Sequence, residues 1–326
     1  EAFGTWGVVL ALVTTVQLVA TTGFPQGFAR AIAADEKSFH DIAGASLRFE
    51  LLVIGVLTLA YLGAAGLLAR WLGDASLTHQ IRISAIIIPT YALMTTFDYY
   101  LNGLRRFKQE AIVQTAGSVA RLGLVFGLVA TGFGITGGFI GFGIGSLAGW
   151  LVAWRFLGRF KRTSQPYPWR AFLAFGLPAT LFSVCIFLVQ SLDLFAVKAL
   201  LHDDAKAGYY TSAGTIARTP FFLFLGIGGV LMPSLAKARA AKDTEFIRSS
   251  LTDSLRYMLM LLVPLVLLVS ATSTQLVVLL FSENYEPAGE ALQVLILGIG
   301  ALSLFMALAY AIISSGLPRE SKIPCL

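Results

Sequence analysis

Residues 135–157 of the chain read ITGGFIGFGIGSLAGWLVAWRFL, with Arg155 as their only charged side chain. A helix of about 20 such residues crosses the roughly 30 Å hydrocarbon core of a bilayer. Glycine recurs in this stretch at every fourth residue, which places a stripe of small residues along one helix face and lets a second helix pack closely against it. The glycines of this stripe are Gly137, Gly141, Gly145 and Gly149. The stretch therefore predicts a closely packed transmembrane helix.

The rest of the chain has the same apolar character. Its 326 residues are 56% hydrophobic and 13% charged, with a mean hydropathy of +0.77, whereas soluble domains carry about 25% charged residues. A soluble globule of this composition would expose large apolar patches to water. We therefore predict an all-α integral membrane protein with nine spans. The predicted spans are residues 3–23, 46–69, 80–102, 111–131, 135–157, 171–196, 208–232, 252–275 and 288–314.

Basic residues are distributed unevenly among the predicted loops. If the first span runs from outside to inside, 18 of the 24 Lys and Arg residues fall on the inner side and only four on the outer side. This bias is what the positive-inside rule requires of cytoplasmic loops. The net charge of +6 is then a sign of topology, and no nucleic-acid partner is predicted. The loops are too short for a folded extramembrane domain.

Two cysteines are too few for a disulfide framework or a metal site. We expect neither a metal nor another cofactor.

A weak internal repeat relates the ends of two predicted spans. Residues 101–108 read LNGLRRFK after the third span, and residues 314–322 read SSGLPRESK after the ninth. Similarly, AFGTW at residues 2–6 opens the first span and AGYY at residues 207–210 opens the seventh. An offset of six spans preserves orientation, so the halves are predicted to be parallel repeats of a two-lobed transporter bundle. The predicted lobes are residues 1–165 and 166–326.

Several short blocks together resemble one family of transporters. They are Gly23-Phe24-Pro25-Gln26-Gly27-Phe28-Ala29-Arg30, Gln190-Ser191-Leu192-Asp193, Ala207-Gly208-Tyr209-Tyr210-Thr211-Ser212-Ala213 and Leu231-Met232-Pro233-Ser234-Leu235. In spacing and pattern the chain resembles the polysaccharide transporter, or O-antigen flippase, family of the multidrug/oligosaccharidyl-lipid/polysaccharide superfamily. The resemblance implies two lobes around a central cavity. It also implies a fragment that lacks the family's first span and its last spans.

Two arginines lie near the middle of predicted spans, Arg121 in 111–131 and Arg218 in 208–232. An Arg at the bilayer centre costs about 2.5–3.5 kcal/mol on insertion scales, so each should face the bundle interior or a hydrated cavity. Such a guanidinium binds an anionic head group well. The alternative is a structural Arg that neighbouring carbonyl groups satisfy. One arginine lies in each predicted lobe, and together they could line a cationic cavity for pyrophosphate.

Four further residues have both a functional and an ordinary interpretation. Arg30 is either a positive-inside anchor or a cytoplasmic gate residue that contacts the lipid pyrophosphate. Asp98 is either part of an interfacial belt or a coupling site for a monovalent cation. Asp193, with Gln190 nearby, is either an interfacial helix cap or part of the cavity or outer gate.

The leading hypothesis is a flippase, not an enzyme, that moves a polyprenyl-pyrophosphate-linked oligosaccharide across the bacterial cytoplasmic membrane. The resemblance supplies this substrate class. A cation-coupled multidrug exporter of the same superfamily is the nearest alternative, and it predicts acidic rather than Arg-lined cavity residues. A membrane glycan polymerase or ligase is the alternative of another class, and it should show a large outer loop with catalytic Arg or His.

Overall fold

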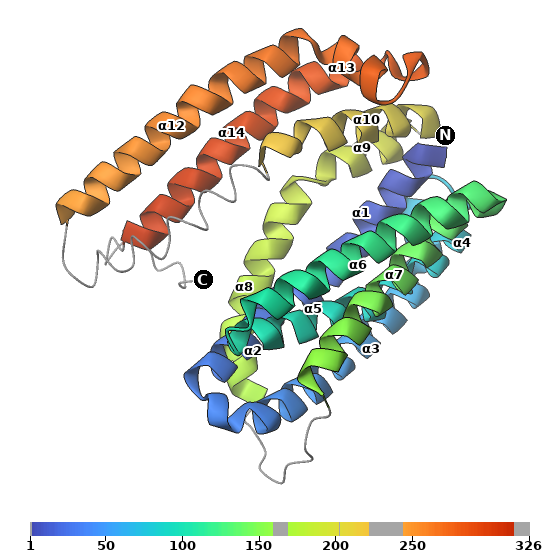
Figure 1. The fold of residues 1–326 in the computed structure, drawn as a ribbon. Coiled ribbons are helices and arrows are strands. Elements are labelled where there is room, and N and C mark those ends of the chain that lie inside the picture. Colours follow the sequence, from blue (N-terminus) through green and yellow to red (C-terminus); the bar gives the residue numbers. More distant parts are fainter. Residues whose placement is uncertain (1, 159–168, 202, 222–243, 316–326) are drawn as a thin grey trace. The chain divides into compact units, whose positions relative to one another are not determined.

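The computed structural model describes residues 2–158, 169–201, 203–221 and 244–315 (Figure 1). These residues are almost entirely helical and contain no strand, which confirms the predicted all-α class. They form two compact units, of which the first extends to Asp204 and the second begins at Ala205. The division into lobes at residues 165 and 166 stays a prediction.

The first unit contains most of the described helices. In chain order they are α1 (Ala2–Thr21), α2 (Gly23–Ala34), the short η1 (Glu36–Ser38), α3 (Phe39–Trp71), α4 (Leu77–Ser84), α5 (Ile87–Gly103), α6 (Phe107–Leu128), the π-helical η2 (Val129–Phe133), α7 (Gly134–Leu157), α8 (Trp169–Val189) and α9 (Leu192–Leu201). The long helices run beside one another in Figure 1, and α5 packs against α1, α2, α3, α6 and α7. The unit is therefore a helical bundle with α5 in its interior.

The glycine stripe of α7 is the reason that α6 and α7 pack so closely. A Cβ atom at Gly141 would lie 2.8 Å from the backbone nitrogen of Val125, and one at Gly145 would lie 2.6 Å from that of Arg121. Gly149 faces Gly117 one turn further along, where a Cβ would lie 3.1 Å from the Gly117 Cα. Because the contacts move backward along α6 as they move forward along α7, the two helices are antiparallel. The predicted packing role of this stripe is confirmed.

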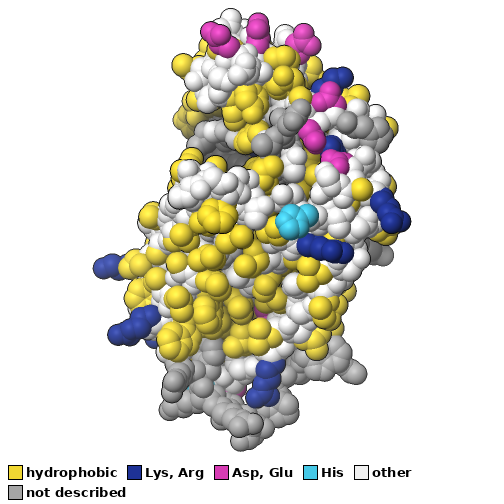
Figure 2. Space-filling view, turned by 90° about the vertical axis from the view of Figure 1, so that its right-hand side faces the viewer, with side chains coloured by type: hydrophobic (Ala, Val, Ile, Leu, Met, Phe, Trp, Pro, Cys, Tyr) yellow, Lys and Arg dark blue, Asp and Glu magenta, His cyan; other side chains and the backbone are white. Residues whose placement is uncertain are grey.

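Large apolar side chains on the outside of the bundle mark the surface that faces lipid. Leu59 of α3 is 72% exposed and Phe126 of α6 is 71% exposed, which would be costly in water. On the face drawn in Figure 2, hydrophobic side chains crowd together over a broad area, and most of the Lys and Arg side chains lie toward its edges. This distribution is the one expected of a membrane protein.

Within the described residues, six helical stretches are long and apolar enough to cross a membrane. They are Phe3–Ala34, Glu36–Trp71, Phe107–Leu157, Phe172–Val189, Arg248–Ala271 and Ala288–Leu308. The difference from nine predicted spans has identifiable sources. Phe107–Leu157 includes two predicted spans, which are joined through a bend at Gly132 with φ +94°. The predicted span 80–102 is divided between α4 and α5, and the second half of 208–232 lies outside the described residues.

The second unit contains α10 from Ala205 onward (α10 is Asp204–Ala217), α12 (Thr244–Ala271), α13 (Ser273–Leu280), η3 (Glu283–Tyr285) and α14 (Ala288–Ser315). Helices α12 and α14 pack side by side, and Gly300 of α14 fits against Val266 of α12. The basic loops 159–168 and 233–243 and most of the predicted repeat at 314–322 lie outside the described residues.

Candidate functional site

Two pairs of polar side chains join α5 to α6 inside the first unit. The Asn102 amide donates hydrogen bonds to both carboxylate oxygens of Glu110, each at 3.1 Å. The Gln114 amide donates to Oδ2 of Asp98 at 2.6 Å. The second pair lies four residues earlier on α5 and four residues later on α6, as expected for two antiparallel helices in register. The α5–α6 interface is therefore built around buried or half-buried polar contacts.

Arg121 continues the same interface seven residues beyond Gln114. Its guanidinium carbon lies 5.0 Å from the centre of the Tyr91 ring of α5 and 5.4 Å from that of the Phe142 ring of α7. One guanidinium nitrogen donates to the Ser118 hydroxyl at 3.0 Å, and another lies 4.0 Å from the sulfur of Met94. Within the part of the chain that the structure describes, no carboxylate forms an ion pair with Arg121. The arginine thus lies against aromatic faces without a counter-ion.

Asp98 is buried inside the bundle, where it is 5% exposed. One carboxylate oxygen receives the Gln114 hydrogen bond, and the other, Oδ1, has no hydrogen-bond partner among the described residues. A buried carboxylate with one free oxygen can accept a further donor or a cation.

Glu50 of α3 is a buried carboxylate that the sequence analysis missed. It is 0% exposed, and neither of its oxygens has a hydrogen-bond partner among the described residues. One turn earlier on α3, the Ser46 hydroxyl lies 2.8 Å from the Tyr100 hydroxyl of α5. The sequence does contain a sign of this site, because a carboxylate five residues into a predicted span is costly and often functional.

The other predicted site residues of the first unit belong to α2, to the turn between α8 and α9, and to α9. Arg30 is exposed near the end of α2. Gln190 lies in the turn that separates α8 from α9, and Asp193 lies in the first turn of α9, where its carboxylate accepts a hydrogen bond from the Leu194 backbone at 2.7 Å. Acidic residues are favoured at helix N-termini, so this contact is compatible with the helix-cap interpretation of Asp193.

Arg218 belongs to the second unit, directly after α10. It is half-buried, and its guanidinium lies 3.9 Å from the position of a Cβ built at Gly214, one turn earlier. The side chain therefore folds back along its own helix. No group of His, Cys, Asp and Glu in the described ranges is arranged to hold a metal ion.

Solved structures of membrane transporters share this architecture. The chain is similar to an inward-facing multidrug resistance MATE family transporter of the MOP superfamily, with a TM-score of 0.72 at 17% identity over 97% of this chain and 82% of that one. It is also similar to the lipid II flippase MurJ in an inward closed conformation, with a TM-score of 0.67 at 16% identity over 97% and 76%. A MOP superfamily transporter from Pyrococcus furiosus gives 0.61 at 17% identity over 96% and 76%. The fold is that of a MOP-type transporter.

Residues 1–290 match the model of the family described as polysaccharide biosynthesis protein. The chain belongs to this family, as the resemblance of its sequence blocks indicated. A curated relative, the uncharacterized membrane protein YabM of Bacillus subtilis (strain 168), is 26% identical over 273 residues, which cover 75% of this chain and 51% of the relative. The chain spans about half the length of that relative.

Proposed function

We propose that the chain is part of a flippase that moves a polyprenyl-pyrophosphate-linked oligosaccharide from the inner to the outer leaflet of the bacterial cytoplasmic membrane. Membership of the polysaccharide biosynthesis family supports a glycan-related substrate, and the transporter fold supports movement without bond cleavage. The MurJ structure is described as a lipid II flippase, so a lipid-linked saccharide is a cargo that this fold can carry.

The observation that carries the proposal is that Arg121 lies within a helix of the bundle without a carboxylate partner among the described residues. A guanidinium within an apolar helix is costly unless an anion or polar groups compensate its charge. Here two aromatic rings, a hydroxyl and a thioether surround it, and no carboxylate pairs with it among the described residues. The planar fork that remains can bind a phosphate with paired hydrogen bonds. We assign Arg121 to the pyrophosphate, with Arg218 and Arg30 as further cationic positions and Gln190 and Asp193 as groups for the glycan.

The test is a flipping assay in proteoliposomes with a fluorescent polyprenyl-pyrophosphate oligosaccharide. The chain is compared with Arg121→Ala, with Arg121→Lys, and with the control Arg82→Ala, an exposed position on α4. Loss of a charged hydrogen bond of about 1.5–3 kcal/mol should slow flipping by roughly 10- to 100-fold in Arg121→Ala, and less in Arg121→Lys. Equal rates for Arg121→Ala and the unmodified chain would refute the assignment. No flipping by the full-length protein to which this chain belongs would refute the flippase function.

A second candidate function is supported by a different observation, the two buried carboxylates Asp98 and Glu50. Acidic residues inside the bundle suit a cation-coupled multidrug exporter, with Asp98 as the cation site. Export of a cationic dye from the same proteoliposomes distinguishes the two functions. Dye transport that Asp98→Asn abolishes and Arg121→Ala leaves unchanged would favour the exporter over the flippase.

A further inference from the structure

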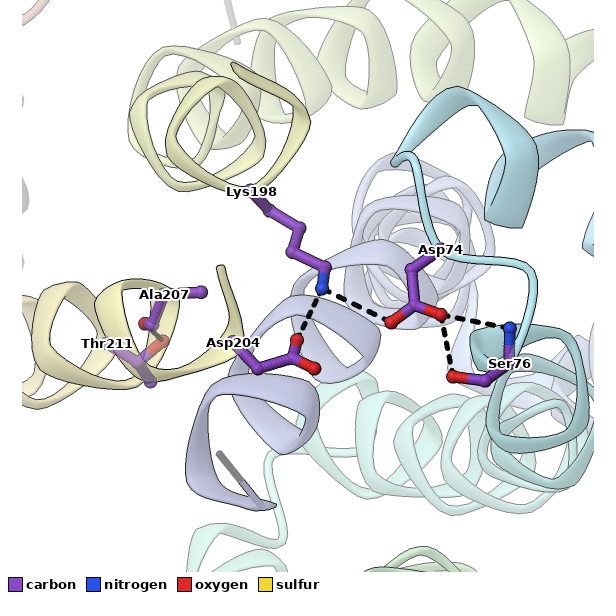
Figure 3. A network of polar contacts seen from close by, with 6 residues as sticks. All are labelled: Asp74, Ser76, Lys198, Asp204, Ala207 and Thr211. Carbon is purple, nitrogen blue, oxygen red and sulfur yellow. Dashed lines mark hydrogen bonds and ion pairs between the residues drawn. The ribbon is translucent and has the colours of Figure 1, made fainter. Parts of the chain in front are cut away.

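Lys198 of α9 is buried between two carboxylates. It is 1% exposed. Its ammonium nitrogen lies 3.3 Å from Oδ2 of Asp74, in the loop between α3 and α4, and also pairs with Asp204, the first residue of α10 (Figure 3). All three residues belong to the first unit. A lysine that is almost fully buried is rare unless it is paired, so the two carboxylates account for its position.

The loop that carries Asp74 presents the carboxylate to Lys198 in a fixed orientation. Oδ1 of Asp74 accepts hydrogen bonds from the Ser76 backbone at 3.0 Å and from the Ser76 hydroxyl at 2.6 Å, while Oδ2 faces the lysine. Burial alone would raise the pKa of Asp74. The hydrogen bonds from Ser76 and Lys198 outweigh it and hold the pKa below its usual value of 3.8. The carboxylate is therefore ionised at neutral pH.

Helix α9 is short and separate from its neighbours along the chain. A turn at Gln190 and Ser191 divides it from α8, and it ends at Leu201. Its buried residues are Leu194, Phe195 and Lys198, and the Phe195 ring packs edge-on against Trp71 at the end of α3, with 6.5 Å between ring centres. Thus one aromatic contact and the Lys198 ion pairs join α9 to the end of α3 and the loop that follows it, and α9 also packs against α1 and α8.

An ionic group is an unusual way to fix a helix permanently. A buried ion pair gives little net stability compared with apolar packing, because both charges must lose their water. The same property makes it reversible, since separated charges at the end of a bundle regain their hydration. Separating a purely apolar contact would expose apolar surface to water, and no hydration of charges would offset that cost.

We propose that Lys198, Asp74 and Asp204 form an ionic latch that holds α9 against the α3–α4 loop, and that releasing it opens this end of the bundle. The predicted lobe boundary at residues 165 and 166 assigns Asp74 to the first lobe and Lys198 to the second. The predicted topology places both on the outer side. The latch would then join the two lobes at their outer end and part when the cavity opens outward. Only this last consequence rests on the proposed transport function.

The latch is tested by the accessibility of the buried face of α9. A reporter cysteine replaces Leu194, which is 4% exposed, in the full chain with Cys185→Ser and Cys325→Ser. Modification by a water-soluble maleimide is followed in detergent micelles, where both ends of the bundle meet water and the result does not depend on membrane orientation. Lys198→Met removes the charge, and Lys206→Met makes the same change at an exposed position on α10.

We expect Lys198→Met to increase the modification rate by about tenfold or more, because it leaves two carboxylates without their shared partner. Lys206→Met should leave the rate unchanged. Equal rates in Lys198→Met and the reporter chain would overturn the latch, as would an equal increase in both variants. Size-exclusion profiles and helical content verify folding.

If Lys198→Met does not fold, Asp74→Asn provides the second variant. It keeps an acceptor for Ser76 and removes one charge, so we expect a smaller increase in the same direction, and no increase would overturn the latch. The labelling needs no substrate. Failure of the latch therefore leaves the proposed flippase function intact, and failure of flipping leaves the labelling result valid.

Discussion

The guanidinium carbon of Arg121 lies 5.0 Å from the centre of the Tyr91 ring, so that α6 presents its in-span cation to an aromatic face of α5. A cation–π contact compensates part of the charge while it leaves the hydrogen-bonding edge of the guanidinium available. A carboxylate partner would instead occupy the edge that a phosphate needs. The pairing of Arg121 with Tyr91 is therefore the arrangement expected of an arginine that must be stable both with and without an anionic ligand.

Removing the Tyr91 ring should weaken this support. We expect Tyr91→Leu to lower the stability of the first unit by about 0.5–2 kcal/mol, the range for cation–π contacts, and to slow flipping. Tyr91→Phe keeps the ring and should behave like the unmodified chain. Thermal unfolding in detergent and the flipping assay measure both effects. If Tyr91→Phe is as impaired as Tyr91→Leu, the hydroxyl group and not the ring is what matters.

A side chain at Gly145 should separate α6 from α7. The Cβ of Gly145→Ala would lie 2.5 Å from the Cα of Arg121, and neither backbone can move without disturbing the helix pair. Overpacking of this kind costs about 1–3 kcal/mol. The control is Gly123→Ala on α6, where a Cβ has nothing within 4 Å and alanine should stabilise the helix by about 0.5–1 kcal/mol. Opposite changes in melting temperature are expected, and equal changes would contradict the packing role of the stripe.

The glycine stripe and the interior orientation of Arg121 could be predicted because both depend on local rules. A four-residue glycine period has one geometric consequence in a helix, and an in-span arginine cannot face lipid. The burial of Lys198 could not be predicted in this way. Its partner Asp74 is 124 positions away in the sequence, and no local pattern in either outer loop of the predicted topology indicates that the two residues meet.

The environment of Glu50 could be predicted only in part. The sequence shows that a carboxylate lies within an apolar span, which is costly. It does not show that a hydrogen-bond donor is absent, because donors come from other helices. Likewise, the pairing of Asp98 with Gln114 depends on the register of α5 against α6, which the loop between them sets. The sequence predicted which residues are unusual, and the packing of helices decides which of them meet.

We expect Glu50 to lower the stability of the folded chain, so that its role is not a stabilising one. A buried carboxylate without a donor costs about 1–3 kcal/mol, so we expect Glu50→Leu to raise the melting temperature and Glu50→Gln to change it little. If Glu50 also takes part in transport, Glu50→Leu will be more stable and less active. The two measurements are made on the same preparations. A Glu50→Leu variant that is less stable than the unmodified chain would show that the carboxylate has a ligand or a water partner.

The hydrogen bond from Gln114 should be the main support of Asp98. Gln114→Leu leaves a buried carboxylate without its donor, and we expect a loss of about 1–3 kcal/mol in unfolding free energy. Thr115→Leu, at the next and exposed position of α6, is the control and should be neutral. Comparing the melting temperature with and without added monovalent salts then tests the cation interpretation of Asp98. Specific stabilisation by one cation, absent in Asp98→Asn, would support it.

Asp74 should make the stability of the first unit sensitive to acid. Its pKa in the folded protein lies below the usual 3.8, through Ser76 and Lys198 and against the effect of burial. A carboxylate with a lowered folded pKa contributes stability that is fully present above its unfolded pKa and is lost as the pH falls through the folded pKa. The melting temperature should therefore fall on acidification below about pH 4, and it should fall less steeply in Asp74→Asn.

The control is Asp253→Asn, at an exposed position of α12, in which the melting temperature should fall as steeply as in the unmodified chain. An unchanged acid slope in Asp74→Asn would mean that the ionic group formed with Lys198 does not contribute to stability in solution.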